Sequence, residues 1–250
     1  MGSKKPLLIA NWKLHHSKAS AGDFFERVVP VIAAVKHVDL AIAPVALMLD
    51  FSVQKLCKSS IKVAAQNVFY EEKGAFTGEW SVAQLREIGV SMAIVGHSER
   101  RSIFKESDSD VAKKARACLL GGLTPIICVG ESLKERDEGQ LEAVLNRQCQ
   151  LVMEHIKDLD GEIIFAYEPL WAIGTGRSAS AKEADEAHGI IFKILDKRPA
   201  KVIYGGSVKA DNIREIVAMP HVDGALVGGA SLQVESFLSM VKELNKNELD

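Results

Sequence analysis

The chain has 250 residues, 47% of them hydrophobic, which is enough to bury a sizeable core in one large domain or two small ones. Its 31 basic and 33 acidic residues are spread along the sequence and give a formal net charge of -2, so we expect no basic surface for nucleic acid or an anionic membrane. No apolar stretch approaches the roughly 20 residues that a membrane-spanning helix requires.

Eight short apolar runs, rich in residues that favour β-structure, recur along the chain and are interpreted as strands. They cover residues 7–10, 40–43, 62–65, 92–95, 125–129, 163–167, 201–204 and 224–227. Their starts lie about 31 residues apart on average, which is the size of a strand–helix–strand unit with its crossover helix.

The segments between these runs carry helical patterns. Apolar side chains recur at helical spacing in two of them, at Phe24, Val28, Val31, Ile32 and Val35, and at Val111, Ala115, Cys118 and Leu119. Pro30 predicts a kink in the first of these helices. Helix starts are predicted where a serine precedes a glutamine or glutamate by three residues, at Ser81 and Ser180, and Gly121 is predicted to follow a helix end.

Eight such units in 250 residues, with no linker or low-complexity segment between them, predict one α/β domain spanning residues 1–250. A closed (β/α)8 barrel is favoured over an open doubly wound sheet. In a barrel, the carboxyl ends of all strands converge on one face, and barrel enzymes hold their chemistry there.

Polar side chains follow the predicted strands. They are Asn11, Lys13, Gln66, Asn67, His97, Glu131, Glu168 and Ser207. Any one of them alone could be a solvated strand end, His97 could be a core histidine and Lys13 a surface charge. Their combination at one end of a barrel predicts a catalytic site.

Glycines at the last two strands predict a phosphate site. Gly205 and Gly206 precede Ser207 directly after the seventh strand, and Gly228 and Gly229 follow the eighth. Glycine lets backbone N–H groups approach an anion closely, and barrels repeatedly bind phosphate there, although a single glycine pair could also form a simple turn.

Other patterns in the sequence point to no cofactor. His15 and His16 are adjacent and lack a third ligand at a metal-like spacing, so we expect no metal site. The glycines around residue 175 imitate a dinucleotide-binding pattern but lie too far from the strand that they should follow directly.

Five segments together resemble the triosephosphate isomerase family along essentially the whole chain. They are NWK at 11–13, GHSERR at 96–101, AYEPLWAIGTG at 166–176, YGGSV at 204–208 and LVGG at 226–229. The resemblance implies interconversion of dihydroxyacetone phosphate and D-glyceraldehyde 3-phosphate through an enediolate, in glycolysis and gluconeogenesis, with no metal or organic cofactor.

The resemblance also implies a role for each residue of the site. Glu168 is the base, His97 polarises the carbonyl, Lys13 stabilises the enediolate and the phosphate, and Asn11 orients the substrate. The phosphate is bound by backbone N–H groups of Gly174, Ser207, Gly228 and Gly229. Pro169, Leu170 and Trp171 form a stiff hinge for a lid whose tip, residues 172–176, closes over the phosphate.

A homodimer is expected from the long connection at residues 66–80. Its tip, GAFTGE at 74–79, resembles the loop that in this family inserts into the partner subunit, which would place Thr77 against the partner's Asn11 and the partner's Lys13. The alternative is a mobile surface loop.

The start of the chain, MGSKKP, lacks the apolar segment of a signal peptide, and four cysteines show no paired spacing. We therefore expect a cytoplasmic protein with free thiols. The segment 14–16 and the residues Arg177, Ser178 and Ala179 after the lid differ from common family sequences. Two other functions stay open, namely another phosphate-handling barrel enzyme and a non-catalytic barrel that binds phosphate compounds.

Overall fold

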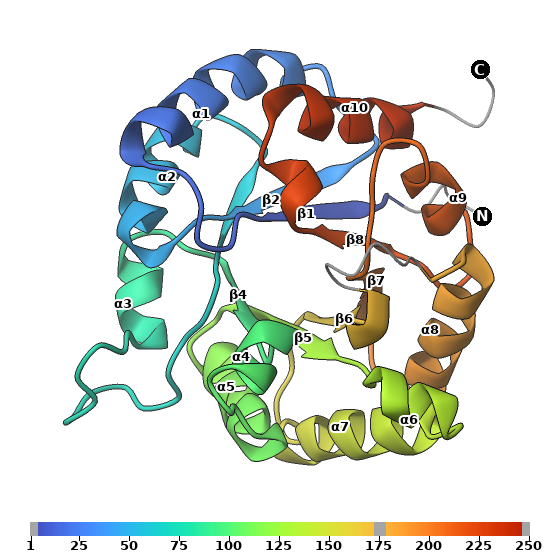
Figure 1. Cartoon of the computed structure of the whole chain (residues 1–250). Coiled ribbons are helices and arrows are strands. Elements are labelled where there is room, and N and C mark those ends of the chain that lie inside the picture. Colours follow the sequence, from blue (N-terminus) through green and yellow to red (C-terminus); the bar gives the residue numbers. More distant parts are fainter. Residues whose placement is uncertain (1–4, 173–178, 247–250) are drawn as a thin grey trace.

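The computed structural model describes residues 5–172 and 179–246 and consists of a closed barrel of eight parallel strands surrounded by helices (Figure 1). The strands are β1 (Leu7–Asn11), β2 (Asp39–Ala43), β3 (Lys62–Ala65), β4 (Met92–Val95), β5 (Thr124–Val129), β6 (Ile163–Tyr167), β7 (Ala200–Tyr204) and β8 (Gly224–Val227). Each strand pairs with the next in sequence, and β8 closes the barrel on β1. The predicted (β/α)8 fold is confirmed, and each predicted strand matches an observed one to within one residue at either end.

Ten helices of the described chain pack around the barrel. They are α1 (Lys18–Ile32), α2 (Leu49–Leu56), α3 (Val82–Glu87), α4 (Ser98–Ser102), α5 (Asp108–Leu120), α6 (Leu133–Asp137), α7 (Leu141–His155), α8 (Ala181–Leu195), α9 (Ile213–Val217) and α10 (Val234–Asn245). Three single turns of 3-10 helix accompany them: η1 (Ala46–Met48), η2 (Leu170–Ala172) and η3 (Gly229–Ser231). In the part of the chain described, no helix has the length and apolar character to cross a membrane.

Alternation along the strands divides the core into two layers. In β1, Leu7 and Ile9 belong to a cluster inside the barrel, whereas Leu8 and Ala10 belong to the larger cluster between the strands and the helices. Successive side chains of a strand point to opposite faces, and both faces of a barrel strand are covered, so the runs are apolar throughout rather than alternating with polar residues.

Local signals place several helix ends as predicted. Ser81 and Ser180 each accept a hydrogen bond from the backbone N–H three residues later, and the side chains of Gln84 and Glu183 bind back to the two serine N–H groups. Gly121 follows α5. Packing requires a glycine at this position, because a Cβ there would lie 2.2 Å from Val82 Cγ1.

The apolar face of α1 differs from the prediction at its end. Phe24, Val28 and Ile32 are buried, but Val31 is half exposed and Val35 lies beyond the helix. Pro30 sits in the last turn, and α1 ends two residues later, so the kink expected there stays a prediction.

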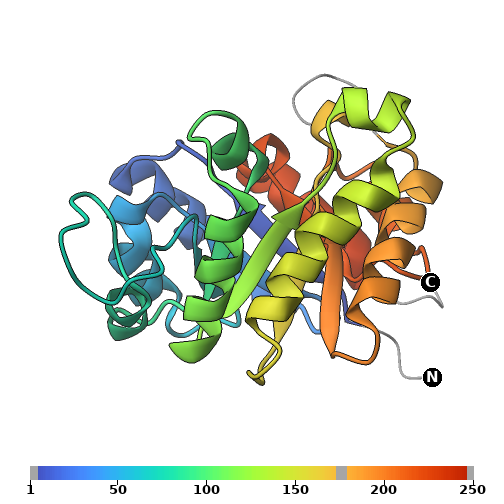
Figure 2. The same cartoon turned by 90° about the horizontal axis from the view of Figure 1, so that it is seen from below.

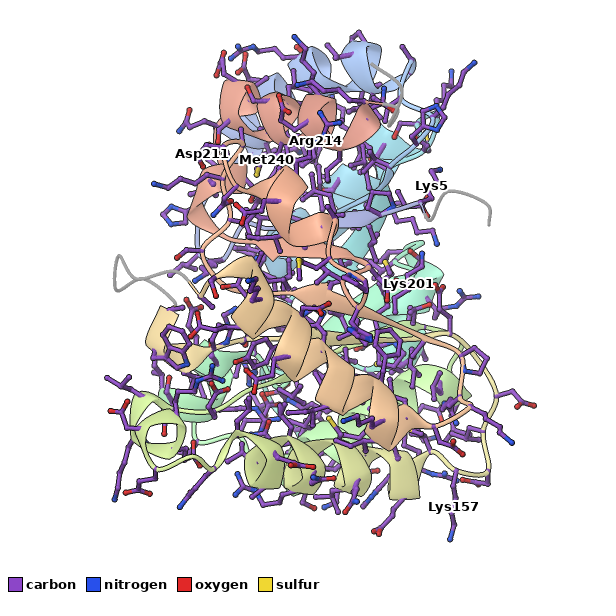
Figure 3. All side chains as sticks on the ribbon, turned by 90° about the vertical axis from the view of Figure 1, so that its right-hand side faces the viewer. Lys5, Lys157, Lys201, Asp211, Arg214 and Met240 are labelled. Atoms are coloured by element: carbon purple, nitrogen blue, oxygen red, sulfur yellow. The ribbon has the colours of Figure 1, made fainter. Side chains whose placement is uncertain are left out.

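The ladder between β7 and β8 is the shortest in the barrel. Tyr204 and Ala225 are the strand residues paired there. The buried Asp223 extends the contact with two hydrogen bonds: its N–H donates to the Val202 carbonyl, and its carboxylate accepts the Val202 N–H. At the amino end of the strands, Lys5 and Lys201 lie on the same side of the molecule (Figure 3) and both contact Asp39. This end is therefore tied together by charge pairs.

The opposite, carboxyl end of the strands carries the loops and short helices that could form a site. In Figure 2, α4 and α6, which follow β4 and β5, both lie at this end of the barrel. The connection 66–80 projects from the side of the barrel (Figure 1), and residues 71–79 are all exposed.

The base of this projecting connection is held by a buried ionic network. The ammonium of Lys114 binds Asn67 Oδ1 and the carboxylate of Glu106, and Arg100 binds the same carboxylate. Lys114 and Glu106 have side chains only 5% and 4% exposed, so each charge depends on its partners. The connection thus leaves the barrel from a rigid base.

Candidate active site

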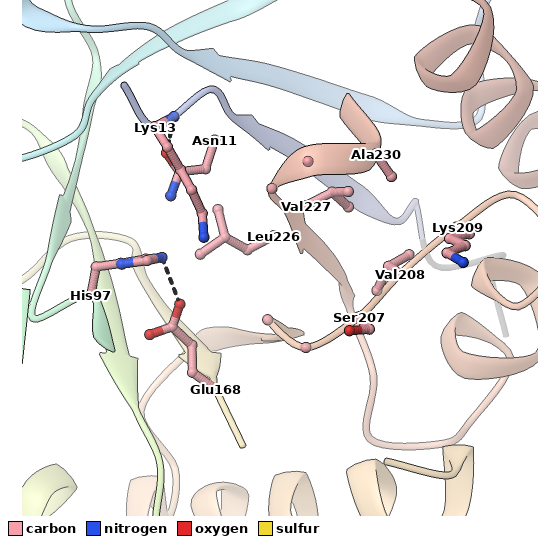
Figure 4. Close-up of a pocket in the computed structure, with 14 residues that line it drawn as sticks. Asn11, Lys13, His97, Glu168, Ser207, Val208, Lys209, Leu226, Val227 and Ala230 are labelled. Carbon is pink, nitrogen blue, oxygen red and sulfur yellow. Dashed lines mark hydrogen bonds and ion pairs between the residues drawn. The ribbon is translucent and has the colours of Figure 1, made fainter. Parts of the chain in front are cut away.

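A cavity of about 240 Å³ lies at the carboxyl ends of the strands (Figure 4). All seven predicted site residues within the described chain line this cavity: Asn11, Lys13, His97, Glu168, Ser207, Gly228 and Gly229. The eighth, Gly174, falls within residues 173–178, outside the described residues, as do Arg177 and Ser178. Residues from the ends of β1, β4, β6, β7 and β8 therefore meet in one cavity.

Glu168 follows β6 and is 2% exposed. Its backbone N–H still donates to Val129 of β5, which continues the ladder one residue past the strand and fixes the Cα. One carboxylate oxygen accepts a hydrogen bond from the Ser98 N–H at 2.8 Å, and the other lies 3.1 Å from His97 Nε2. The backbone is thus fixed by β5 and the carboxylate by two adjacent residues at the start of α4.

His97 is the residue at which β4 gives way to α4, as the sequence predicted. Its Nδ1 accepts a hydrogen bond from the Glu99 N–H at 3.2 Å. Because a ring nitrogen that accepts an N–H carries no hydrogen, the hydrogen of the ring is assigned to Nε2, which points at Glu168. The Glu99 carboxylate lies 3.7 Å from Nδ1, too far for a hydrogen bond.

Lys13 reaches the cavity from a strained backbone position after β1, with φ of 50°. Asn11 Oδ1 accepts its N–H at 3.1 Å, and the Gln66 amide donates to its carbonyl at 2.8 Å, so two side chains hold this conformation. The Lys13 ammonium forms an ion pair with Glu99 at 2.6 Å. Strain of this kind persists only where the surroundings over-determine it, and it clusters at functional sites.

The glycines beside the cavity have a packing role in addition to the predicted anion role. A Cβ on Gly205 would lie 2.8 Å from Glu168 Cγ, and a Cβ on Gly228 would lie 3.1 Å from Lys13 Cε. A Cβ on Gly206 would lie 2.1 Å from the Tyr204 hydroxyl oxygen. These glycines leave room for the side chains of the site.

Three predicted strand-end residues lie outside the cavity lining: Gln66, which donates to the carbonyls of Lys13 and Ala43, Asn67 and Glu131. Asn67 binds Lys114 as described above, and Glu131 is fully buried with one carboxylate oxygen accepting from the Tyr167 hydroxyl at 3.0 Å and Trp171 Nε1 at 2.9 Å. Burial raises the pKa of Glu131, and these hydrogen bonds oppose that shift. Glu131 therefore lies past the carboxyl end of β5, as predicted, and anchors the segment that follows Glu168.

Sequence reasoning missed three participants in the site. Ser98 and Glu99 bind Glu168 and Lys13, and Lys209 lines the cavity beyond Ser207. Ser98 and Glu99 lie in the motif GHSERR, so their proximity to His97 was the available signal.

A barrel that brings a paired glutamate and histidine and a lysine to glycine-rich turns defines a class of proteins, the barrel enzymes that move protons on small anionic substrates. The family model described as triosephosphate isomerase matches residues 6–244, nearly the whole chain. The chain belongs to the triosephosphate isomerase family.

Individual relatives agree with the family match. The triosephosphate isomerase of Citrifermentans bemidjiense is 44% identical over 247 residues, which cover 96% of this chain and 98% of that protein. The triosephosphate isomerase of Rubrobacter xylanophilus is 42% identical over 250 residues, with coverage of 96% and 98%. That of Streptococcus equi subsp. zooepidemicus is 42% identical over 253 residues, with coverage of 97% and 100%. The resemblance noted in the sequence is confirmed, and the chain is an isomerase.

Proposed function

We propose that the chain interconverts dihydroxyacetone phosphate and D-glyceraldehyde 3-phosphate in glycolysis and gluconeogenesis, with Glu168, His97 and Lys13 as its catalytic residues. Family membership supports the reaction. The observation that carries the roles is the 3.1 Å contact between Glu168 and His97 Nε2 in a cavity that Lys13 and Asn11 also line.

The reaction requires a proton to leave a carbon atom beside a carbonyl group. A Glu168 carboxylate oxygen takes this proton, and the electron pair of the C–H bond passes into an enediolate. The same carboxyl then returns a proton to the neighbouring carbon, and the hydroxyl proton passes from one enediolate oxygen to the other, so that carbonyl and hydroxyl exchange places and no atom is gained or lost. Glu168 is held by His97 and Ser98, and a substrate entering between Glu168 and His97 takes over the first of these contacts.

His97 and Lys13 act on the oxygen atoms where negative charge develops. The hydrogen assigned to His97 Nε2 is directed into the cavity and donates to the carbonyl oxygen once the substrate separates it from Glu168. The Lys13 ammonium, held near the cavity by Glu99, stabilises the enediolate and the phosphate, and Asn11 orients both Lys13 and the substrate.

Backbone N–H groups of Ser207, Gly228 and Gly229 bind the phosphate, together with Gly174 from the lid. Closure of the lid on the hinge formed by Pro169, Leu170 and Trp171 excludes water from the enediolate. The bonds of Trp171 and Leu170 to Glu131 support this assignment, because they fix the hinge to the loop after β5.

The proton-abstraction mechanism is tested by isomerisation in D2O. The glyceraldehyde 3-phosphate formed from dihydroxyacetone phosphate is trapped by a coupled dehydrogenase, and NMR or mass spectrometry measures its deuterium content. We expect deuterium at the carbon that receives the proton, because a proton held on Glu168 exchanges with solvent. Product formed entirely without solvent deuterium would indicate direct hydride transfer between the carbons, and substrate incubated without protein controls for spontaneous exchange.

We further propose a homodimer in which Thr77 of the connection 66–80 contacts the partner's Asn11 and the partner's Lys13. The exposure of residues 71–79 supports this, as do two leucines exposed at the carboxyl ends of other strands, Leu14 at 91% in the loop after β1 and Leu47 at 88% in η1. Apolar side chains exposed to this degree on loops are typical of surfaces that a partner covers.

The dimer is tested with the variant Phe76→Asp. Phe76 is 41% exposed in the tip of the connection, and Leu133→Asp is a matched control because Leu133 is 43% exposed on α6. We expect Phe76→Asp to shift sedimentation toward the monomer and to reduce kcat at least about tenfold, since a charge must be buried at the interface. The control keeps the dimer and the activity. A wild-type monomer with full activity at assay concentrations would contradict the proposal.

A cytoplasmic location is also proposed. The four cysteines are free, and Cys118, Cys128 and Cys149 are buried. Burial raises the pKa of the Cys118 thiol to about 12, which keeps it unreactive. Free thiols and the glycolytic role of the family support a reducing compartment.

A further inference from the structure

Lys209 lines the active-site cavity but takes no part in the proposed reaction. It lies past Ser207 and Val208 on the Ala230 side of the cavity, away from Glu168 and His97 (Figure 4). Its side chain is exposed, so the charged end can move in solvent, and in the described part of the chain no carboxylate pairs with its ammonium. The cavity thus has a cation at its outer, phosphate-binding end.

The backbone of Lys209 is held rigidly to Ser207. Asn212 bridges the two residues, since its side-chain oxygen accepts the Lys209 N–H at 2.8 Å and its amide donates to the Ser207 carbonyl at 3.1 Å. Val208 between them is buried. Lys209 therefore keeps a constant position relative to the predicted phosphate ligand Ser207, and none of these bonds uses its ammonium.

Charges around the cavity show why a further cation matters. Lys13 is paired with Glu99, so these two charges largely cancel at a distance, and the Glu168 carboxylate leaves the inner site negative. The whole chain also has a formal charge of -2. A phosphate dianion that approaches the cavity is attracted by the positive charge of Lys209, which offsets the repulsion from the negative charge of Glu168.

We infer that Lys209 attracts the phosphate group of the substrate to the cavity and contributes to the preference for phosphorylated over phosphate-free substrates. This inference rests on the proposed function. Lys209 lies away from the atoms that react, so it acts on capture and binding, while Glu168, His97 and Lys13 set the rate of the chemical step. Because its charge is exposed, its effect is screened by salt.

The test compares Lys209→Met, which removes the charge and keeps an unbranched side chain, with Lys157→Met. Lys157 is exposed and lies far from the cavity in the loop after α7 (Figure 3), so the control changes the net charge equally. At low salt we expect Lys209→Met to raise KM for glyceraldehyde 3-phosphate about three- to tenfold with kcat within twofold of wild type. Lys209→Arg restores KM, and about 0.3 M NaCl reduces the difference between Lys209→Met and wild type.

Two further measurements separate the possible outcomes. Turnover of glyceraldehyde, which lacks the phosphate, is expected to be equal in Lys209→Met and wild type. Binding of inorganic phosphate, measured by calorimetry, is expected to weaken about three- to tenfold in Lys209→Met and to stay unchanged in Lys157→Met. If wild-type protein failed to isomerise triose phosphates, the proposed function would be wrong while the phosphate titration still tested Lys209. Equal phosphate affinity and equal KM in the two methionine variants would overturn the inference.

Discussion

Replacing Glu168 by glutamine is expected to lower kcat at least about a hundredfold, because the variant keeps the shape of the side chain but removes the proton acceptor. The substitution affects only the two hydrogen bonds that the Glu168 carboxylate accepts. Glu168 is buried between the Ser98 N–H and His97 Nε2, both of which donate to the carboxylate. A glutamine amide has a single acceptor oxygen and satisfies one of these two donors, so the other loses its partner.

Steady-state isomerisation rates measure this effect, and binding of inorganic phosphate or phosphoglycolate tests whether the cavity survives. We expect these anions to bind the Glu168→Gln variant, because Ser207, Gly228 and Gly229 lie on other loops of the cavity. Glu142→Gln, at an exposed position on α7, is the matched control and should keep full activity. A Glu168→Gln variant that retained most of its kcat would show that another group removes the proton.

Replacing Pro169, Leu170 and Trp171 together by glycine is expected to lower kcat and weaken binding of phosphoglycolate about 10- to 100-fold. At roughly 0.5–1 kcal/mol of added backbone freedom per residue, about 1.5–3 kcal/mol opposes closure. In the wild type this segment is ordered by the bond from Trp171 Nε1 to Glu131, the bond from the Leu170 N–H to the Glu131 carbonyl, and the turn closed between Ala172 and Pro169. Arg136 also lies over the Trp171 ring.

Product analysis distinguishes a loosened lid from a damaged site. An enediolate that is no longer enclosed eliminates its phosphate, so methylglyoxal should rise in the triple-glycine variant. Trp171→Phe is the control for packing, since it removes the bond to Glu131 without adding backbone freedom. We expect a smaller loss in Trp171→Phe, and thermal unfolding of both variants close to that of wild type. Wild-type kcat and phosphoglycolate affinity in the triple-glycine variant would refute preorganisation by the hinge.

The meeting of the three proposed catalytic residues could be predicted from the sequence because each lies within two residues of the end of a strand. Once β1, β4 and β6 are recognised as strands of one barrel, the residues Lys13, His97 and Glu168 must come to the same end of it. The homologous motifs then supplied the chemistry. The partners of these residues could not be predicted, because Lys13 and Glu99 are 86 positions apart in the sequence and Ser98 and Glu168 are 70 apart.

The sequence by itself determined the eight strands, the single barrel, and the helix starts at Ser81 and Ser180. These features depend on runs and spacings within a few residues, where backbone hydrogen bonds and side-chain periodicity act. Only the tertiary structure decided that Glu131 binds Leu170 and Trp171 and that Lys209 lines the cavity. The direction of a polar side chain at a strand end depends on what the neighbouring strands and loops place beside it, and closure of the barrel sets those neighbours.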